Sequence, residues 1–202
     1  EENKKLKQLN EQYNSNKFEF AVIYGRRRIG KTSLIQEFIK NKEALFLLAL
    51  KQPKTKSYQF KSGYITKNSE NISFNSFQAA LENILQQTYK KTIIFIIDEY
   101  PYLANSYPAI SSILQLLIDK NKENSKLFLI LCGSSLSFME EQVLGYQSPL
   151  YGRRTSQYKI KPFSFFETCD YYKTFSYEEK ALIYGLTSGI PLYLSLFRKI
   201  NH

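Results

Sequence analysis

An eight-residue segment rich in glycine and basic residues constrains the fold of this chain more than any other feature. Its sequence is Gly-Arg-Arg-Arg-Ile-Gly-Lys-Thr, from Gly25 to Thr32. A short apolar, β-rich run precedes it over residues 18–24, and apolar residues at helical spacing follow it over residues 34–39. The glycines let successive backbone N–H groups surround an anion, and the following helix adds its positive end. The segment therefore predicts a strand, a phosphate-binding loop and a helix.

The residue types in this loop indicate a nucleoside triphosphate. Lys31 should reach the β- and γ-phosphates, and the Thr32 hydroxyl should ligate Mg²⁺. We therefore expect ATP or ADP with Mg²⁺ to bind here. The simpler alternative is a turn that only begins a helix, and the arginines could likewise be solvent-exposed positions. The residues expected to contact the nucleotide are Gly25, Arg26, Arg27, Arg28, Ile29, Gly30, Lys31, Thr32 and Ser33.

A pair of carboxylates follows the most apolar run of the chain. Ile-Ile-Phe-Ile-Ile over residues 93–97 suits a strand covered on both faces, and Asp98 and Glu99 come directly after it. We expect Asp98 to hold Mg²⁺ and Glu99 to orient or deprotonate the attacking water. Acidic pairs at strand ends are common, so the prediction depends on their combination with the phosphate loop.

Two further places could contribute to catalysis. The apolar run over residues 127–132 ends in Gly-Ser-Ser, which would place the Ser134 hydroxyl beside the same cleft to sense the γ-phosphate or position water. Capping of the next helix is an equally good explanation of these serines. Arg153, in Gly-Arg-Arg over residues 152–154, could add positive charge to the transferring phosphoryl group, in its own chain or in a neighbour. An ordinary surface pair is the stronger alternative.

The alternation of apolar patterns predicts an α/β fold with a parallel sheet covered by helices on both faces, and a ligand at the carboxyl ends of the strands. Further strands are expected over residues 44–50 and near residues 157–160, and helices near residues 77–85 and 110–117. We expect the polar stretch over residues 51–71 to be an exposed excursion. The pattern becomes helical at residue 164, which predicts a nucleotide-binding core over residues 1–163 and a partial helical lid over residues 164–202.

Composition narrows the function further. The chain has 202 residues and a net charge of +10, which makes polyanions such as nucleotides or nucleic acid natural partners. Its single histidine, His202, leaves little material for histidine-based catalysis. Two distant cysteines and the lack of a long apolar run or signal-peptide pattern predict a cytoplasmic protein without a membrane partner.

Taken together, the segments YGRRRIGKTSLI, IIFIIDEYPYL, LCGSS, PLYGRR and SGIPLYL resemble the archaeal-type ATPase family, in the STAND branch of the AAA+ superfamily. The resemblance implies a P-loop nucleotide-binding core followed by a helical lid, with ATP at their junction. It also implies that Gly189 and Pro191, which match the Gly-x-Pro element, bring Pro191 close to the adenine or ribose. Members usually begin with a Gly-Arg-Glu segment and often continue into a C-terminal effector domain, and neither is found here.

The first functional hypothesis is ATP hydrolysis coupled to conformational change of a larger assembly or effector domain. The second is a slow nucleotide-dependent switch with little turnover, and self-association is compatible with either. A third is a DNA-associated module that uses the basic surface. A small-molecule kinase has the same phosphate loop, but the acidic pair after the strand favours water as the acceptor.

Overall fold

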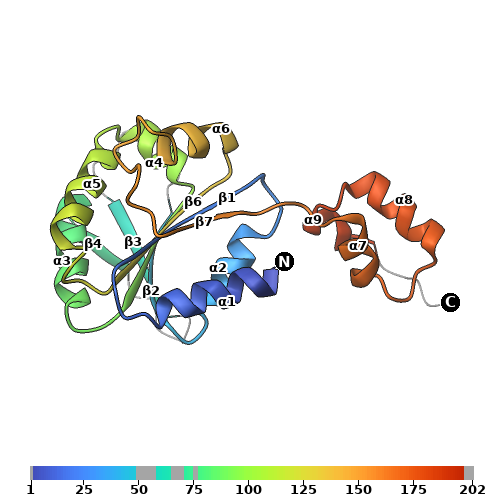
Figure 1. Ribbon diagram of the computed structural model, residues 1–202, viewed down its shortest axis with the longest axis horizontal. Coiled ribbons are helices and arrows are strands. Elements are labelled where there is room, and N and C mark those ends of the chain that lie inside the picture. Colours follow the sequence, from blue (N-terminus) through green and yellow to red (C-terminus); the bar gives the residue numbers. More distant parts are fainter. Residues whose placement is uncertain (1, 49–57, 65–70, 75–76, 198–202) are drawn as a thin grey trace.

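The computed structural model describes residues 2–48, 58–64, 71–74 and 77–197. A seven-stranded sheet forms its centre, with the strand order β4-β3-β2-β5-β6-β1-β7 (Figure 1). The strands are β1 (Glu19–Tyr24), β2 (Glu43–Leu48), β3 (Tyr58–Tyr64), β4 (Asn71–Phe74), β5 (Ile93–Asp98), β6 (Leu127–Gly133) and β7 (Ser156–Lys159). The helical segments are α1 (Glu2–Tyr13), α2 (Lys31–Ile39), α3 (Phe77–Thr88), α4 (Tyr100–Ser106), α5 (Ile110–Asn121), α6 (Leu136–Phe138), the π-helical turn Met139–Val143, α7 (Phe165–Tyr171), α8 (Tyr177–Thr187) and α9 (Pro191–Leu194).

The strands β2, β5, β6, β1 and β7 run parallel, and their pairing fixes where the polar residues meet. Tyr24 lies opposite Gly133, and Ile97 lies opposite Leu131. The strands β1, β5 and β6 therefore end at the same edge of the sheet. The segments that follow these three strands, which carry the predicted phosphate loop, the acidic pair and Ser134, are brought together by this register.

Helices cover both faces of the sheet, as predicted. One face packs against α3, α4 and α5, and the other packs against α1 and α2. The strands β1, β5 and β6 contribute alternate side chains to the two clusters, which explains why their sequences are apolar over most of their length. On the second face the rings of Phe38 in α2 and Phe128 in β6 meet edge to face, with their centres 5.4 Å apart.

One sheet edge differs from the prediction. The exposed excursion expected over residues 51–71 is wrong for its described parts, because β3 and β4 add two antiparallel strands beside β2. Pairing uses backbone N–H and C=O groups, so an edge strand does not need the apolar run that marks a buried one. The sheet is therefore mixed rather than wholly parallel. The last two residues of the strand expected over 44–50 lie outside the described residues.

Two helices were not predicted. Helix α1 packs Leu9 into the second face, and Leu6 and Tyr13 lie beside it. Helix α4 begins directly after the acidic pair and buries Tyr100 and Leu103 on the first face. Helix α1 has few apolar residues and α4 has only seven residues, so each gives a weak periodic signal and depends on the sheet for its stability.

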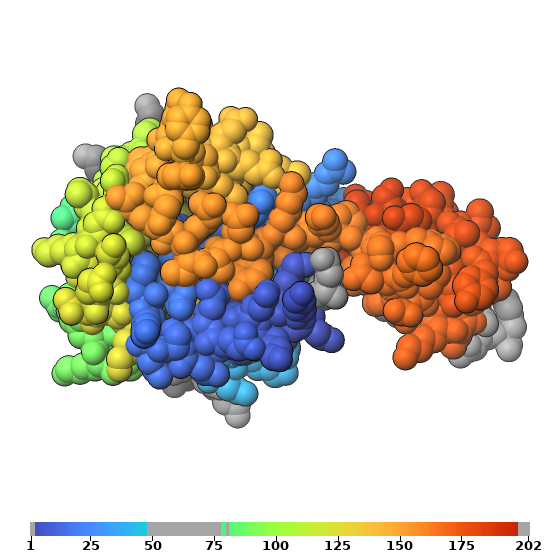
Figure 2. All heavy atoms as spheres, viewed as in Figure 1, coloured from blue at the N-terminus to red at the C-terminus, as the bar shows by residue number. Residues whose placement is uncertain are grey.

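A separate helical lobe (residues 164–197) follows β7. Figure 2 shows it projecting from the α/β core and joined to it by a narrow neck. Capping boxes begin α7 and α8, in which Ser164 pairs with Glu167 and Ser176 pairs with Glu179. Within the described part of the chain, no helix combines the length and apolar character that a membrane span requires.

Candidate functional site

The loop between β1 and α2 is held in place by contacts that only glycine permits at its first position. A Cβ atom at Gly25 would lie 2.4 Å from the Ile160 carbonyl oxygen and 2.5 Å from the Ile29 side chain. Gly30 takes a left-handed conformation, with φ of 94°, directly before Lys31 begins α2. The free N–H groups and positive end of α2 therefore face the loop, as an anion-binding site requires.

Lys31 lies at the centre of this loop. Its side chain is buried, and its Nζ donates hydrogen bonds to the carbonyl oxygens of Gly25 at 2.9 Å and Arg26 at 2.8 Å. These carbonyls are neutral partners for a buried ammonium group. A phosphate oxygen would be a stronger partner for this ammonium group than either carbonyl oxygen.

The other residues of the loop divide into anchors and exposed side chains. Ile29 is fully buried and fixes the loop to the core, so its backbone rather than its side chain could face a ligand. Arg27 and Arg28 are exposed and donate to the hydroxyl groups of Tyr102 and Tyr193, respectively. The third arginine, Arg26, is also exposed.

The acidic pair lies at the end of β5, which is separated from β1 by β6, and both of its residues are tightly positioned. Glu99 has a left-handed backbone with φ of 52°, which is uncommon for a non-glycine residue. Its N–H donates to Asp98 Oδ1 at 2.9 Å, and its carboxylate accepts a hydrogen bond from Ser134 Oγ at 2.9 Å. Ser135 makes no capping hydrogen bond through its side chain. The serine after β6 therefore contacts the predicted water-activating carboxylate.

A buried thiol lies beside the acidic pair, and no sequence pattern predicts its position there. Cys132 is the penultimate residue of β6 and is fully buried. Burial raises the pKa of the Cys132 thiol well above its usual value, and the adjacent Asp98 charge and hydrogen bond act in the same direction. The thiol thus stays protonated and is a neutral neighbour of the Asp98 carboxylate.

The phosphate loop and the acidic pair line one cavity of about 390 Å³, a size suited to a small ligand. Thr32 and Asp98 both line it, and Mg²⁺ at nucleotide sites is commonly held by one or two protein oxygens together with phosphates. Thr32 and Asp98 are therefore two residues of this lining that could hold a Mg²⁺ ion. Of the residues predicted from sequence, those lining the cavity are Arg27, Arg28, Gly30, Lys31, Thr32, Ser33, Asp98, Glu99 and Pro191, and Leu192 joins them.

Arg153 is not brought to this cavity. Arg153 lies just before β7. The nearby Thr155 donates its N–H to the carbonyl oxygen of Phe20 at the start of β1, whereas the phosphate loop follows the end of β1. The strand from Phe20 to the phosphate loop spans about five residues, or roughly 16 Å. Arg153 instead forms a two-bond ion pair with Asp119 in α5, with distances of 2.6 and 2.8 Å. Within its own chain Arg153 therefore contacts Asp119 and does not line the cavity, and the alternative that it acts on a neighbouring chain stays a prediction.

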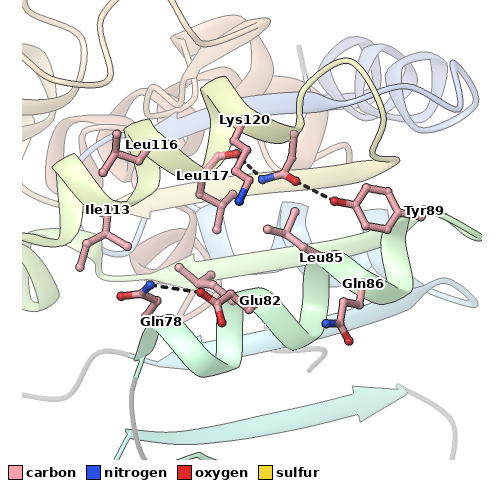
Figure 3. Close-up of a pocket in the computed structure, with 11 residues that line it drawn as sticks. Gln78, Glu82, Leu85, Gln86, Tyr89, Ile113, Leu116, Leu117 and Lys120 are labelled. Carbon is pink, nitrogen blue, oxygen red and sulfur yellow. Dashed lines mark hydrogen bonds between the residues drawn. The ribbon is translucent and has the colours of Figure 1, made fainter.

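A second hollow lies between α3 and α5, on the side of the core away from the helical lobe (Figure 1). Figure 3 shows Leu85 and Leu117 within it, with Tyr89 at one end bonded to Asn121. Its walls are helix surfaces with few charged groups. It therefore lacks the features of the strand-end cavity that suit a phosphate.

In a comparison with known proteins, a single protein family matches both the α/β core and the helical lobe. Residues 2–197 match the model of an ATPase domain found predominantly in Archaea. An uncharacterized protein of Methanocaldococcus jannaschii, MJECL04, is 42% identical over 190 residues, which cover 94% of this chain and 42% of the relative. An uncharacterized ATP-binding protein of the same organism, MJ0423, is 47% identical over 38 residues, covering 19% of this chain and 64% of that protein. The chain thus spans less than half of the first relative's length.

Solved structures show the same fold. The Walker-type ATPase PabY2304 of Pyrococcus abyssi has a TM-score of 0.65 at 20% identity, covering 94% of this chain and 64% of that one. A chain of the Drosophila ORC bound to DNA has a TM-score of 0.60 at 14% identity, covering 96% and 52%. ORC2 of Aeropyrum pernix has a TM-score of 0.54 at 15% identity, covering 88% and 51%. At these identities the likeness concerns the fold alone.

Proposed function

Because this chain belongs to the family of ATPase domains found predominantly in Archaea, we propose that it binds ATP at the strand-end cavity and hydrolyses it to ADP and phosphate. The observation that carries this proposal is the meeting of Lys31, Asp98 and Glu99 around one cavity, with Ser134 hydrogen-bonded to the glutamate. Three strand ends separated in sequence supply these groups. A turn that merely began a helix would not need them.

The residues divide the work of hydrolysis as follows. The N–H groups at the start of α2 and the Lys31 ammonium bind the phosphates, once Lys31 has left the carbonyls of Gly25 and Arg26. Thr32 and Asp98 would hold Mg²⁺, which supplies neutralisation of phosphate charge when bound. Glu99 orients a water molecule and accepts its proton as the water oxygen attacks the γ-phosphorus, and the bond to the ADP oxygen breaks.

Ser134 positions the carboxylate of Glu99. A hydrogen bond from its hydroxyl fixes one carboxylate oxygen, which leaves the other oxygen available to the water. The left-handed backbone at Glu99 fixes the same side chain from its other end. Pro191 and Leu192 close the cavity from the helical lobe, so nucleotide binding would be coupled to the position of that lobe.

Phosphate release in the presence of Mg²⁺ tests this proposal. The wild-type chain should turn over ATP, and Glu99→Gln should keep ATP affinity but lose at least about a hundredfold in turnover, as expected when a positioned base is removed. Glu123→Gln, which changes an exposed carboxylate outside the cavity, is the matched control. Equal turnover in wild type and Glu99→Gln would contradict the role of Glu99.

A slow switch is the second candidate, favoured by the contact of Pro191 and Leu192 with the phosphate-loop cavity. In this case ADP or ATP would remain bound for long periods and set the position of the helical lobe or of an effector domain. Retention of nucleotide through gel filtration, with less than one phosphate released per chain, would favour the switch. Rapid multiple turnover by the isolated chain would favour the hydrolase.

Nucleic acid is a candidate partner because of the net charge of +10. Binding of duplex DNA through this charge should weaken steeply as salt rises. Affinity that does not change with salt would remove its electrostatic basis.

A further inference from the structure

Two arginines of the phosphate loop are hydrogen-bonded to tyrosines from different parts of the molecule. Arg27 donates to the Tyr102 hydroxyl in α4, which belongs to the core. Arg28 donates from Nη1 to the Tyr193 hydroxyl in α9 at 2.7 Å, and its guanidinium carbon lies 5.6 Å from the centre of the Tyr193 ring. One pair therefore joins the loop to the core, and the other joins it to the helical lobe.

The backbone adds a second contact between the loop and α9. The N–H of Leu192 donates to the carbonyl oxygen of Arg28 at 3.4 Å. Arg28 has a left-handed backbone with φ of 69°, a conformation that a side chain of this size seldom takes without support. The conformation of the loop at Arg28 and the position of α9 therefore depend on each other.

Contacts within the helical lobe transmit the position of α9 to α7 and α8. The Tyr172 hydroxyl donates to the carbonyl oxygen of Leu194, and both residues are buried with Ile183 in one apolar cluster. Gly189 lies against the neck, since a Cβ atom there would be 1.9 Å from the Phe163 carbonyl oxygen. A change in the contacts of Tyr193 should therefore alter the positions of α7, α8 and α9 together.

The hydroxyl of a tyrosine is a neutral acceptor, whereas a phosphate oxygen is charged. An arginine bonds to a charged oxygen roughly twice as strongly as to a neutral one. Arg28 lines the cavity proposed for ATP, so the phosphates would compete with Tyr193 for it. Because of this competition, occupancy of the cavity by nucleotide should weaken the contact between the phosphate loop and the helical lobe.

We propose that Tyr193 is a positioning residue, which holds Arg28 and the helical lobe together without nucleotide and loses Arg28 to a phosphate when nucleotide binds. The inference rests on the proposed function. It predicts that removing the Tyr193 hydroxyl releases the lobe and also tightens nucleotide binding, by about fivefold for the loss of one competing hydrogen bond. A merely structural role would instead weaken binding.

The chain allows a direct measurement of lobe position. It contains no tryptophan, so Tyr146→Trp at an exposed site of the core supplies a single donor for energy transfer. Cys169 in α7 is partly exposed and can carry a thiol-linked acceptor, while Cys132 is fully buried. Calorimetric titration of the unlabelled protein with ADP and with a non-hydrolysable ATP analogue gives the affinities.

Three variants of this labelled protein separate the contributions. In Tyr193→Phe we expect nucleotide-free energy transfer to equal that of the nucleotide-bound wild type, with about fivefold tighter binding. Tyr102→Phe is the matched control, since it removes the other phenol and should leave nucleotide-free transfer at the wild-type value. Arg28→Ala should change the transfer like Tyr193→Phe but weaken nucleotide binding, because it removes the residue for which phosphate and tyrosine compete.

Unchanged transfer in Tyr193→Phe, or weaker binding by it, would overturn the inference while leaving nucleotide binding by the wild type intact. A wild type that binds neither nucleotide would instead overturn the proposed function, and with it the exchange of Arg28 between tyrosine and phosphate. The two failures are therefore distinguishable in one set of titrations.

Discussion

Glu99 shows how single residues are held for their task in this molecule. Its left-handed backbone costs free energy, and the hydrogen bonds to Asp98 and Ser134 fix the side chain in that unusual position. A flexible glutamate would lose rotamer freedom each time it oriented a water molecule. A glutamate fixed before the substrate arrives does not incur that loss during the reaction.

Removing the Ser134 hydroxyl should therefore slow catalysis more than it weakens binding. For Ser134→Ala we expect turnover to fall about tenfold or more, as the loss of a hydrogen bond to a charged group implies, with ATP affinity changed less than about twofold. Phosphate release and equilibrium binding measure the two effects. Ser135→Ala is the control, because the Ser135 side chain makes no capping bond, and equal losses in both variants would contradict this role for Ser134.

Tyr100 gives a prediction for pH. Burial raises the pKa of its phenol to about 12, opposed only in part by the hydrogen bond with Ser111. Below pH 10 the folded and unfolded chains both keep this proton. Between pH 10 and 12 the unfolded chain ionises and the folded chain does not, so the free energy of unfolding should fall by about 2 to 3 kcal/mol.

Urea unfolding at increasing pH tests this expectation. Tyr100→Phe should be less stable at neutral pH, because it loses the bond with Ser111, and should lack this part of the alkaline decline. Tyr146→Phe, at an exposed site, is the control and should decline as the wild type does. A decline of the same size in Tyr100→Phe would show that another group titrates.

Local sequence signals predict where the candidate site residues lie in the fold better than they predict which residues these contact. Lys31, Asp98 and Ser134 could be placed because each directly follows a recognisable strand end or loop. The pairing of Arg28 with Tyr193 depends on two segments 165 residues apart, and that of Arg153 with Asp119 on two segments 34 apart. No spacing rule connects such residues, so only the folded chain reveals these contacts.

At the scale of elements, the turn between α8 and α9 depends on one glycine. Gly189 has a φ of 69°, and a Cβ atom there would overlap the Phe163 carbonyl oxygen. Gly185, within α8, has open space around the same position. Gly189→Ala should therefore strain the helical lobe, and Gly185→Ala should stabilise α8 by about 0.5 to 1 kcal/mol.

Native-state hydrogen exchange of the amides in α8 measures both changes. Exchange should become faster in Gly189→Ala and slower in Gly185→Ala, with the amides of β5 and β6 unaffected. The same direction of change in both variants would contradict the steric explanation.

The elements that the sequence predicted well are those with a strong apolar pattern. The strands β5 and β6 are buried on both faces, and each has an apolar run of the expected length. The strands β3 and β4 were missed because antiparallel backbone pairing at this side of the sheet needs no such run. Helix α1 was missed because its stability comes from packing on the sheet rather than from its own pattern.

For the whole molecule, stability should be unevenly distributed. Two large apolar clusters hold the core, whereas the buried part of the helical lobe's cluster is Tyr172, Ile183 and Leu194. The lobe also has exposed aromatic sites, among them Phe166 and Tyr177. We expect the lobe to open before the core does.

Limited digestion with chymotrypsin can detect this opening. Cleavage should begin within residues 164–197 and leave a protected core fragment. Phe128→Ala, in the core, should lower global stability by about 3 to 5 kcal/mol without changing the first cleavage site. First cleavage within β5 or β6 would contradict the uneven distribution.

The central claim is that the loop from Gly25 to Thr32 binds ATP, and calorimetric titration of ATP with Mg²⁺ tests it most directly. Wild type should bind one ATP per chain. Lys31→Ala should bind at least about tenfold more weakly, since it removes a charged phosphate partner, and Lys122→Ala, an exposed lysine beyond α5, should bind as wild type does. Equal ATP affinity in all three proteins, or no binding by the wild type, would contradict the claim.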